Sequence, residues 1–409
     1  MKILFTTVKL ADNLGYPSIV SAIIEMNKKY GDDLYLLKKN VDEKEKRLID
    51  YYRLRSVSYS FNSSIFSFII NLTYALIHGN RENNRYEYRR FKELKDFSSF
   101  DAIIDLAGID FTDKFLSRIP FRTLLHHRLW ILAHFLKIPV IKYTCAIGPC
   151  TKLETRLSLK IYSKYCDLFY LRDPESLAIY NELRLITRTK YVPDTAFFMP
   201  VRADSYEYSY IMCKKKEGRK IVGMAASYQH KRRTKKYCEI LSAVIQYLQE
   251  KQYIIILIPN ELSSNYDNDD RVVCREIFNL LPNNENVSVL DVDGLYPEQL
   301  KGVISACNYV ITSRYHSLIA ALSTCTPVIA LSWHHRYRTA LGLFELQDMV
   351  IEDNAFSVEG IINKFIELQE KEDLVRKRMM NRMGSVLDEV CAAYDYVHNY
   401  TKSSKESNA

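Results

Sequence analysis

Short apolar runs alternate with helical stretches along most of this chain, and this alternation limits the folds that the chain can adopt. Apolar runs of strand length are found at Lys2–Val8, Ala102–Leu106, Val140–Tyr143, Leu168–Leu171, Ile221–Ala225, Tyr253–Ile258, Val287–Leu290, Tyr309–Thr312 and Val328–Leu331. Stretches with helical character, such as Lys235–Lys251 and Tyr315–Ser323, lie between them. Strands that alternate with helices in this way are typical of parallel sheets with crossover helices.

The length of the chain predicts two domains, because 409 residues exceed what one hydrophobic core usually supports. We predict an α/β fold of two Rossmann-like domains that face each other across a cleft. The expected boundaries are residues 1–205 for the N-terminal domain and 206–400 for the C-terminal domain, with 401–409 as a frayed tail. In such sheets, ligands bind beyond the carboxyl ends of the strands.

Charge and cysteine content exclude several classes of protein. The net charge is +8, but the basic residues are spread along the chain and form no nucleic-acid-binding motif, so no nucleic-acid partner is expected. The nine cysteines are scattered and never form a C-x-x-C pair. This pattern supports neither a disulfide scaffold nor a zinc site, and it is typical of reduced thiols in the cytoplasm.

The segment Ile65–Ile77 is an apolar run that could be mistaken for a membrane span. It is interrupted by Asn71 and Thr73 and is shorter than the roughly 20 residues that a membrane span needs. A buried or interfacial helix is the better interpretation. Together with the positive net charge, this helix would allow peripheral contact with the inner face of the membrane.

Polar residues that could bind a ligand or transfer a proton follow the expected strand Tyr309–Thr312. Ser313 is a good N-cap, which predicts that Arg314 and His316 lie in the first turn of the next helix. A helix N-terminus carries unpaired N–H donors and partial positive charge, so this turn would bind an anion and hold a proton donor beside it. The alternative is a solvated Arg314 and a structural His316.

The next strand, Val328–Leu331, is followed by an aromatic and cationic segment that includes Arg336 and Arg338. Consecutive parallel strands usually lie side by side. The loops after the two strands would then bring Arg336 or Arg338 near His316. The alternative is a solvated basic loop.

Several sequence blocks in the same order resemble the polysaccharide pyruvyl transferase family. The most specific is S-R-Y-H-S with its apolar helix, followed by P-V-I-A-L-S-W-H-H-R-Y. The other blocks are Asp12–Gly15, Asp105–Asp113, Ile147–Pro149, Leu171–Ser176, Pro193–Ala196 and Ile258–Glu261. Each block is weak alone, but together they extend over roughly residues 1–345.

The resemblance implies a GT-B-like fold, phosphoenolpyruvate as donor, and a sugar or lipid-linked oligosaccharide as acceptor. The acceptor would belong to a surface polysaccharide such as an exopolysaccharide, or to its precursor. The product would be a cyclic pyruvate ketal. Apart from this co-substrate, we expect no cofactor and no metal. Asp267–Asp270 lacks EF-hand spacing and is interpreted as a solvated helix cap.

The resemblance, the chemistry of the donor and the residue types together assign expected roles. His316 is the expected general acid. The expected donor-binding residues are Arg314, Arg336, Arg172, Tyr315 and Ser317, and the expected acceptor-binding residues are Asn13, Asp110, Asp113, Asn260 and Glu261. Two positions depart from the family pattern: Arg336 stands where lysine is more usual, and Tyr16 stands where aspartate is frequent. Arginine keeps the charge of lysine but cannot take part in proton transfer.

Two other functions fit the sequence. A GT-B glycosyltransferase that uses a nucleotide sugar would share the fold. It would usually need glycine-rich phosphate loops, and the chain has only 12 glycines. A non-catalytic homologue that has kept the fold is the other alternative, and it would bind phosphoenolpyruvate without releasing phosphate.

Overall fold

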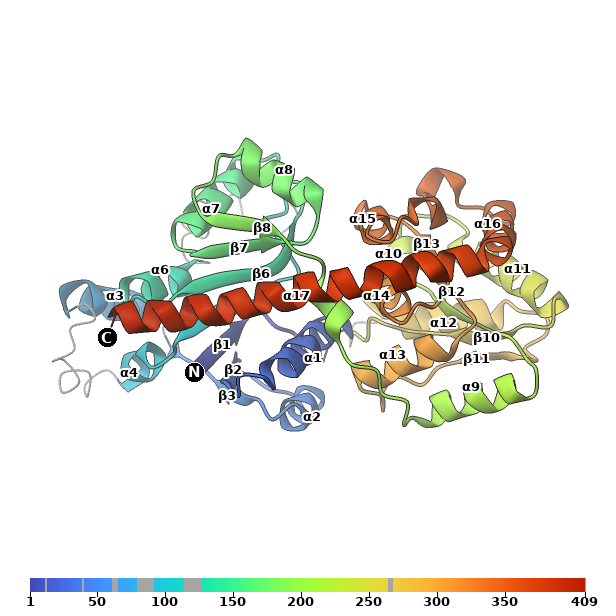
Figure 1. Cartoon of the computed structure of the whole chain (residues 1–409), viewed down its shortest axis with the longest axis horizontal. Coiled ribbons are helices and arrows are strands. Elements are labelled where there is room, and N and C mark those ends of the chain that lie inside the picture. Colours follow the sequence, from blue (N-terminus) through green and yellow to red (C-terminus); the bar gives the residue numbers. More distant parts are fainter. Residues whose placement is uncertain are drawn as a thin grey trace. The chain divides into compact units, whose positions relative to one another are not determined.

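The computed structural model describes residues 1–11, 13–38, 40–60, 65–78, 92–113, 127–263 and 268–408. The chain divides into two compact units. The first unit contains residues 1–8, 26–194 and 389–409, and the second contains residues 9–25 and 195–388. Each unit is built on a parallel sheet with helices between successive strands (Figure 1). The predicted α/β fold of two Rossmann-like domains is therefore confirmed.

The first unit holds a sheet of eight parallel strands in the order β3-β2-β1-β4-β6-β7-β8, with β5 paired to β6. The strands are β1 (Lys2–Thr6), β2 (Asp33–Leu37), β3 (Arg55–Val57), β4 (Ala102–Asp105), β5 (Ile109–Asp110), β6 (Val140–Ile147), β7 (Leu168–Leu171) and β8 (Arg188–Tyr191). The helices are α2 (Glu43–Tyr51), α3 (Ile65–His78), α4 (Lys92–Ser98), α6 (Arg128–Phe135), α7 (Leu153–Lys164) and α8 (Pro174–Glu182). The apolar runs predicted β1, β4, β6 and β7.

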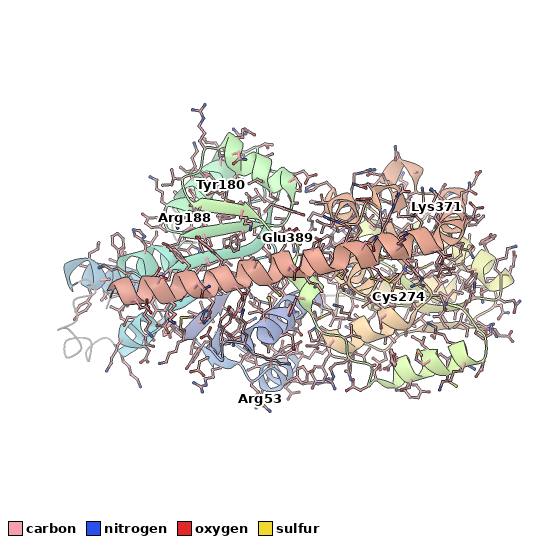
Figure 2. The ribbon with its side chains drawn as sticks, in the orientation of Figure 1. Arg53, Tyr180, Arg188, Cys274, Lys371 and Glu389 are labelled. Carbon is pink, nitrogen blue, oxygen red and sulfur yellow. The ribbon has the colours of Figure 1, made fainter. Side chains whose placement is uncertain are left out.

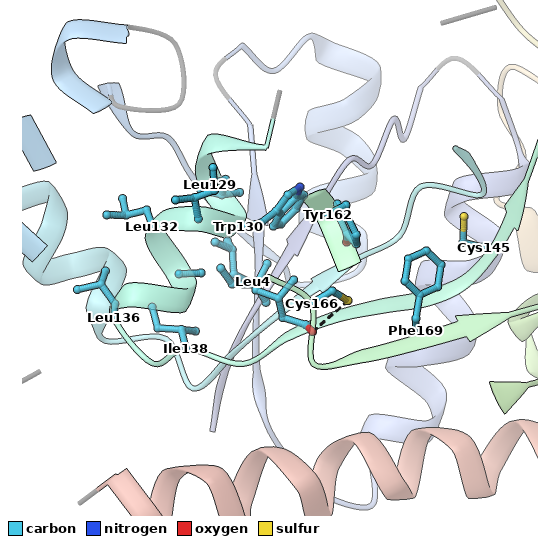
Figure 3. Close-up of a cluster of buried hydrophobic side chains, with 14 of the residues drawn as sticks. Leu4, Leu129, Trp130, Leu132, Leu136, Ile138, Cys145, Tyr162, Cys166 and Phe169 are labelled. Carbon is cyan, nitrogen blue, oxygen red and sulfur yellow. Dashed lines mark hydrogen bonds between the residues drawn. The ribbon is translucent and has the colours of Figure 1, made fainter. Parts of the chain in front are cut away.

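The core of the first unit gathers around α6 (Figure 3). This helix is apolar on nearly every side, and a helix of that composition is normally buried. Leu129 and Leu132 of α6 belong to the same buried cluster as Leu4 of β1 and Phe169 of β7. This buried cluster stabilises the sheet that carries Asp110 at its carboxyl edge.

The second unit holds a sheet of six parallel strands in the order β11-β10-β9-β12-β13-β14. The strands are β9 (Ile221–Ala225), β10 (Ile254–Leu257), β11 (Val287–Val289), β12 (Tyr309–Thr312), β13 (Val328–Leu331) and β14 (Val350–Ile351). The helices are α1 (Gly15–Asn27), α9 (Tyr206–Lys216), α10 (Tyr228–Lys231), α11 (Tyr237–Glu250), α12 (Asp270–Asn279), α13 (Pro297–Ala306), α14 (Tyr315–Ser323), α15 (Arg336–Gly342) and α16 (Val358–Glu370). Short 3₁₀ helices occur at Thr195–Phe198, Gln347–Met349 and Asp353–Ala355.

The long final helix α17 (Glu372–Asn408) contributes to both units, and Glu389 is its first residue in the first unit (Figure 2). The expected frayed tail is instead helical as far as Asn408. Its last turns are held by the first unit, because Lys405 forms an ion pair with Asp101 at 2.9 Å and Tyr400 donates a hydrogen bond to Asp167. These contacts offset the fraying that its small polar residues would otherwise allow.

The division into units also differs from the expected boundary at residue 205. Residues 9–25 and 195–205 group with the second unit, and residues 389–409 group with the first. The first strand therefore lies in one unit, whereas most of the helix that follows it packs in the other. No linker-like composition marks these points in the sequence.

The apolar segment expected to form a buried or interfacial helix is α3. One face of this helix is buried, with Phe68, Asn71 and Ala75 inside the first unit. Within the described ranges, every helix is too short or too polar to cross a membrane.

Candidate functional site

The segment that follows β12 begins at the carboxyl edge of the second sheet. Thr312 ends the strand, and its Oγ accepts a hydrogen bond from the backbone N–H of Arg314 at 2.9 Å. Arg314 occupies the N-cap position of α14, so the expected cap at Ser313 is wrong by one residue. The Ser313 hydroxyl instead accepts a hydrogen bond from Tyr237 at 2.8 Å and lies 3.2 Å from Nδ1 of His230.

Residues that follow β13 form hydrogen bonds with the segment that follows β12. β12 and β13 are paired in parallel, as expected from their order in the chain. Trp333 and Tyr337 both donate hydrogen bonds to the carbonyl oxygen of Ser313, at 3.2 and 2.6 Å. The guanidinium carbon of Arg336 lies 5.0 Å from the ring centre of Tyr315. The prediction that these two loops meet is therefore confirmed, and Arg336 is the arginine that reaches this site.

His316 lies in the first turn of α14, and its imidazole packs directly on Gly15. A Cβ atom added to Gly15 would lie 2.4 Å from Cε1 of His316, closer than any real contact. Gly15 begins α1, so the ring lies at the N-terminal end of a second helix as well as its own. Two helix N-termini place partial positive charge around the imidazole, and this environment favours an anion.

The turn that carries Gly15 is fixed by the loop after β10. The Asn13 side chain accepts hydrogen bonds from the backbone N–H groups of Gly15 and Tyr16, at 2.9 and 3.1 Å. Asn13 also forms an isolated antiparallel bridge with Glu261. The structure thus places Asn13 in the second unit beside Glu261, whereas the expected boundary at residue 205 placed it in the N-terminal domain.

Arg314 is buried between two carboxylates. Its Nη1 lies 2.5 Å from Glu261 Oε2, and its Nη2 forms an ion pair with the fully buried Asp270. Burial disfavours the charged guanidinium, but the two carboxylates outweigh it and raise the pKa of Arg314 above its ordinary value. The alternative of a solvated Arg314 is therefore wrong, and an incoming anion would have to compete with Glu261, the more exposed partner.

Within the acidic run Asp267–Asp270, the first residue lies outside the described residues, and the two aspartates that are described are not solvated. Asp269 caps α12 by accepting from the backbone N–H of Arg271 at 2.8 Å, but it is buried. Asp270 accepts from the backbone N–H groups of Asn260 and Glu261, at 3.2 and 2.8 Å. Asp270 therefore organises the loop after β10, and its ion pair with Arg314 was not predicted from the sequence.

Asn260 and Ser317 are buried and bonded to each other. The Asn260 side chain donates to the Ser317 hydroxyl at 3.1 Å. The backbone carbonyl of Asn260 accepts a hydrogen bond from the N–H of Leu14 at 3.1 Å. These contacts join α14, the loop after β10 and the start of α1, so both residues support the position of His316.

A small and mostly apolar pocket adjoins His316, and Leu14, Met199 and Lys301 contribute to its lining. Nothing in the sequence around Lys301 distinguishes it from the other lysines. Its ammonium group is buried and donates to the backbone carbonyls of Phe197 and Met199, at 3.2 and 2.5 Å. Burial lowers the pKa of Lys301 from 10.5 to about 7.

Lys301 predicts a specific pH dependence of stability. The native state releases this proton near pH 7, whereas the unfolded chain keeps it until about pH 10.5. Unfolding therefore takes up a proton between these values, and the free energy of unfolding rises with pH there, by up to about 1.4 kcal/mol per pH unit. Urea unfolding of the wild type and Lys301→Met from pH 6 to pH 10 measures the difference. Parallel curves for the two proteins would contradict the assignment.

Three predicted site residues lie in the first unit, where each has a local partner. Arg172 is buried, with Nη1 2.5 Å from Asp194 and Nη2 2.6 Å from the carbonyl of Gly108. Asp110 accepts from the buried Lys142 at 2.8 Å. Asp113 accepts from the backbone N–H of Thr151 and of Lys152, just before α7 begins, at 3.0 and 3.2 Å. The sequence did not indicate these partners.

Asp113 and Asp110 differ in how charge and burial act on the pKa values around them. For Asp113, desolvation acts to raise the pKa, but hydrogen bonds from Thr151 and Lys152 outweigh it and lower the pKa to about 2. Beside Asp110, burial acts to lower the pKa of Lys142, but the Asp105 and Asp110 carboxylates raise it well above its ordinary value. Asp113 therefore carries negative charge at neutral pH, and both aspartates help to hold loops at the carboxyl edge of the sheet.

Two Rossmann-like units with parallel sheets define a GT-B-like protein, and solved structures of that class are similar in fold. UDP-GlcNAc 2-epimerase from Neisseria meningitidis, bound to UDP-GlcNAc, has a TM-score of 0.54 and 13% identity, covering 93% of this chain and 94% of that one. A glycosyltransferase from Rickettsia africae has a TM-score of 0.57 and 12% identity, covering 97% and 98%. HepE from Anabaena, in complex with UDP-glucose, has a TM-score of 0.57 and 13% identity, covering 99% and 100%.

The family assignment rests on the sequence. A model of the polysaccharide pyruvyl transferase family matches residues 7–335, which is most of the chain and includes the segments around Gly15, His316 and most of the loop after β13. The chain belongs to the polysaccharide pyruvyl transferase family. It is therefore a transferase by family, and the family implies a sugar or polysaccharide acceptor.

Proposed function

We propose that this protein transfers a pyruvyl group from phosphoenolpyruvate to a sugar of a surface polysaccharide or its precursor, with His316 as general acid. The observation that carries the proposal is the position of the His316 imidazole on Gly15, at the N-terminal ends of α14 and α1. It is supported by the family of the chain.

Phosphoenolpyruvate carries a phosphate and a carboxylate, and the site offers matching positive charge. The guanidinium of Arg336 lies over the ring of Tyr315, the residue that precedes His316 in the chain, and Arg314 occupies the N-cap position of the same helix. The planar fork of arginine suits either anionic group. We propose that one anionic group of the donor replaces Glu261 at Nη1 of Arg314, while Asp270 keeps Nη2 in place. In the proposed donor set, Ser317 keeps the helix in position through Asn260.

The chemistry begins with a proton transfer. The phosphate-bearing carbon becomes electrophilic only when the methylene carbon is protonated, and the imidazolium of His316 supplies this proton. The π electrons form the new C–H bond and leave an oxocarbenium-like centre. A sugar hydroxyl attacks that carbon and gives its proton to the imidazole, which became neutral in the first step. The bond between this carbon and the ester oxygen of the phosphate breaks, and phosphate leaves with the electron pair. A second hydroxyl then adds to the same carbon, gives its proton to the released phosphate, and closes the ketal.

The proposed acceptor is a sugar, and the first unit carries polar residues that suit one. Asp110 and Asp113 lie at the carboxyl edge of the first sheet, where ligands of such sheets bind. Each is engaged by neighbours, so their proposed role is to shape loops that meet a sugar. Arg172, which belongs to the proposed donor set, lies at the same edge and is held by Asp194 and the Gly108 carbonyl. We place the reaction in the cytoplasm, because all nine cysteines are unpaired thiols.

The test is incubation of the purified protein with phosphoenolpyruvate and candidate acceptor sugars. We expect release of inorganic phosphate that depends on the acceptor, together with a new ketal methyl signal in the proton NMR spectrum. Binding of phosphoenolpyruvate without phosphate release for any acceptor would favour the non-catalytic alternative.

A nucleotide-sugar transferase is the second candidate, because proteins of similar fold bind UDP-GlcNAc or UDP-glucose. Identity of 13% makes that likeness one of fold alone. Release of UDP from a UDP-sugar, with no turnover of phosphoenolpyruvate, would support this candidate over pyruvyl transfer.

Gly15→Ala tests whether the position of the imidazole matters. The new methyl group would meet Cε1 of His316 at 2.4 Å, so the ring must move, and it is the flexible end of a side chain that can do so. We expect native-like unfolding and a loss of transfer rate of about 10²-fold, because small misplacements of a catalytic group are costly. The control is Gly294→Ala, since a Cβ there meets nothing within 4 Å. Equal rates for the two variants would refute the role of Gly15.

A further inference from the structure

Helix α3 of the first unit has an outward face made of large apolar side chains. Phe66 is 72% exposed, Ile69 52%, Ile70 39% and Leu76 55%. At 3.6 residues per turn these four side chains lie on one side of the helix, with Thr73 among them. Single exposed apolar residues are normal on protein surfaces, but a continuous row on one helix marks an interaction surface.

The opposite face of α3 packs into the first unit. Phe68, Asn71 and Ala75 are buried, and α3 packs against α6. The first turn is tied to α4, because the Ser60 hydroxyl bonds both to the Ser67 hydroxyl, at 2.7 Å, and to Glu93 of α4, at 2.6 Å. The orientation of the helix is therefore fixed, and its apolar row is directed away from the core of the first unit.

The composition of α3 fits a lipid surface better than water. Its sequence, IFSFIINLTYALIH, contains no Asp, Glu, Lys or Arg, although 26% of the chain is charged. Helices that bury one face at the boundary between lipid headgroups and acyl chains have such rows of Phe, Ile and Leu. With 14 residues the helix is about 21 Å long, too short to cross a bilayer but suited to lying along its surface.

The net charge of the chain favours an anionic membrane. The whole chain carries +8. On the neighbouring α4, the exposed Lys92 and Lys95 are balanced by Glu93 and Asp96, so the attraction comes from the charge of the chain as a whole. Each basic residue near an anionic membrane surface contributes about 1 kcal/mol of attraction.

A second copy of the chain is a weaker occupant for this face. The four apolar side chains expose only a few hundred Å², whereas a stable protein interface buries roughly 800 Å² per partner. We propose that the outward face of α3 docks the protein on an anionic lipid membrane. This proposal does not depend on whether the donor is phosphoenolpyruvate or a nucleotide sugar. A negative result would therefore not contradict the proposed reaction.

The test is flotation of the purified full-length protein with phosphatidylcholine vesicles, with and without phosphatidylglycerol. We expect the wild type to float with the anionic vesicles and to be released by high salt. In Phe66→Ser/Ile69→Ser, we expect vesicle binding to fall by about tenfold or more, since two apolar side chains no longer enter the lipid. The control is Leu153→Ser/Ile186→Ser, because these residues are 78% and 80% exposed but lie outside α3.

Three outcomes would overturn the proposal. One is a wild type that stays with the unbound fraction at low salt. Another is an equal loss of binding in the control pair. The third is a Phe66→Ser/Ile69→Ser variant that unfolds more easily or changes oligomeric state, because protein would then cover this face. Unfolding curves and sedimentation of both variants distinguish these cases from a loss of lipid binding alone.

Discussion

Replacement of His316 by alanine is expected to lower pyruvyl transfer by about 10²–10⁴-fold, the usual contribution of a general acid. Donor binding should remain, because the arginines and the two helix N-termini that favour anions are unchanged. The reason lies in the chemistry of the donor, whose methylene carbon must be protonated before a hydroxyl can attack. Phosphate release and equilibrium binding of phosphoenolpyruvate, measured on the same preparation, separate the two effects.

The matched control is His134→Ala, an exposed histidine on α6 of the first unit. It should transfer at the wild-type rate. If His316→Ala also transfers at that rate, another group delivers the proton and the proposed mechanism fails. If it loses donor binding in parallel with turnover, the imidazole holds the donor and does not act as its acid.

Arg314→Ala is expected to destabilise the protein by about 3–5 kcal/mol, because removing one partner of a buried ion pair leaves the other charge uncompensated. That other charge is the fully buried Asp270, which also accepts hydrogen bonds from three backbone N–H groups, those of Tyr228, Asn260 and Glu261. Urea unfolding, followed by circular dichroism, measures the loss. A change below about 1 kcal/mol would mean that solvent reaches Asp270.

Glu261→Gln is the matched variant for this ion-pair network. Glu261 is the partly exposed partner of Arg314, so the substitution should cost little stability, in the range of surface pairs at about 0–1 kcal/mol. If the donor replaces Glu261 on Arg314, the variant should bind phosphoenolpyruvate more tightly than the wild type. Unchanged affinity would place the donor away from Nη1 of Arg314.

The sequence predicted the strands that carry the site better than the contacts within it. Buried parallel strands are short continuous apolar runs, so β9, β12 and β13 were recognisable without any structure. Their order in the chain then brought Arg336 to Tyr315, next to His316. The prediction that Ser313 caps α14 is wrong because the Ser313 hydroxyl accepts a hydrogen bond from Tyr237 of α11.

Contacts between residues far apart in the sequence could not be predicted. Asp270 and Arg314 are 44 positions apart, and nothing local distinguishes this aspartate from its neighbour Asp269. Arg172 looked available for a ligand, yet Asp194 and the Gly108 carbonyl hold it. The sequence predicted a turn that contains Gly15, but the contact between Gly15 and the His316 ring arises only in the folded protein. Such pairings depend on the tertiary fold, which local patterns do not encode.

The most direct test of the central claim, that phosphoenolpyruvate is the donor, is the effect of ligands on thermal unfolding. At 100 times its dissociation constant, a ligand that binds only the native state adds about 2.7 kcal/mol. We predict that phosphoenolpyruvate raises the melting temperature of the wild type and of His316→Ala, and that UDP-GlcNAc changes neither. A rise with UDP-GlcNAc and none with phosphoenolpyruvate would contradict the account and identify a nucleotide-sugar enzyme.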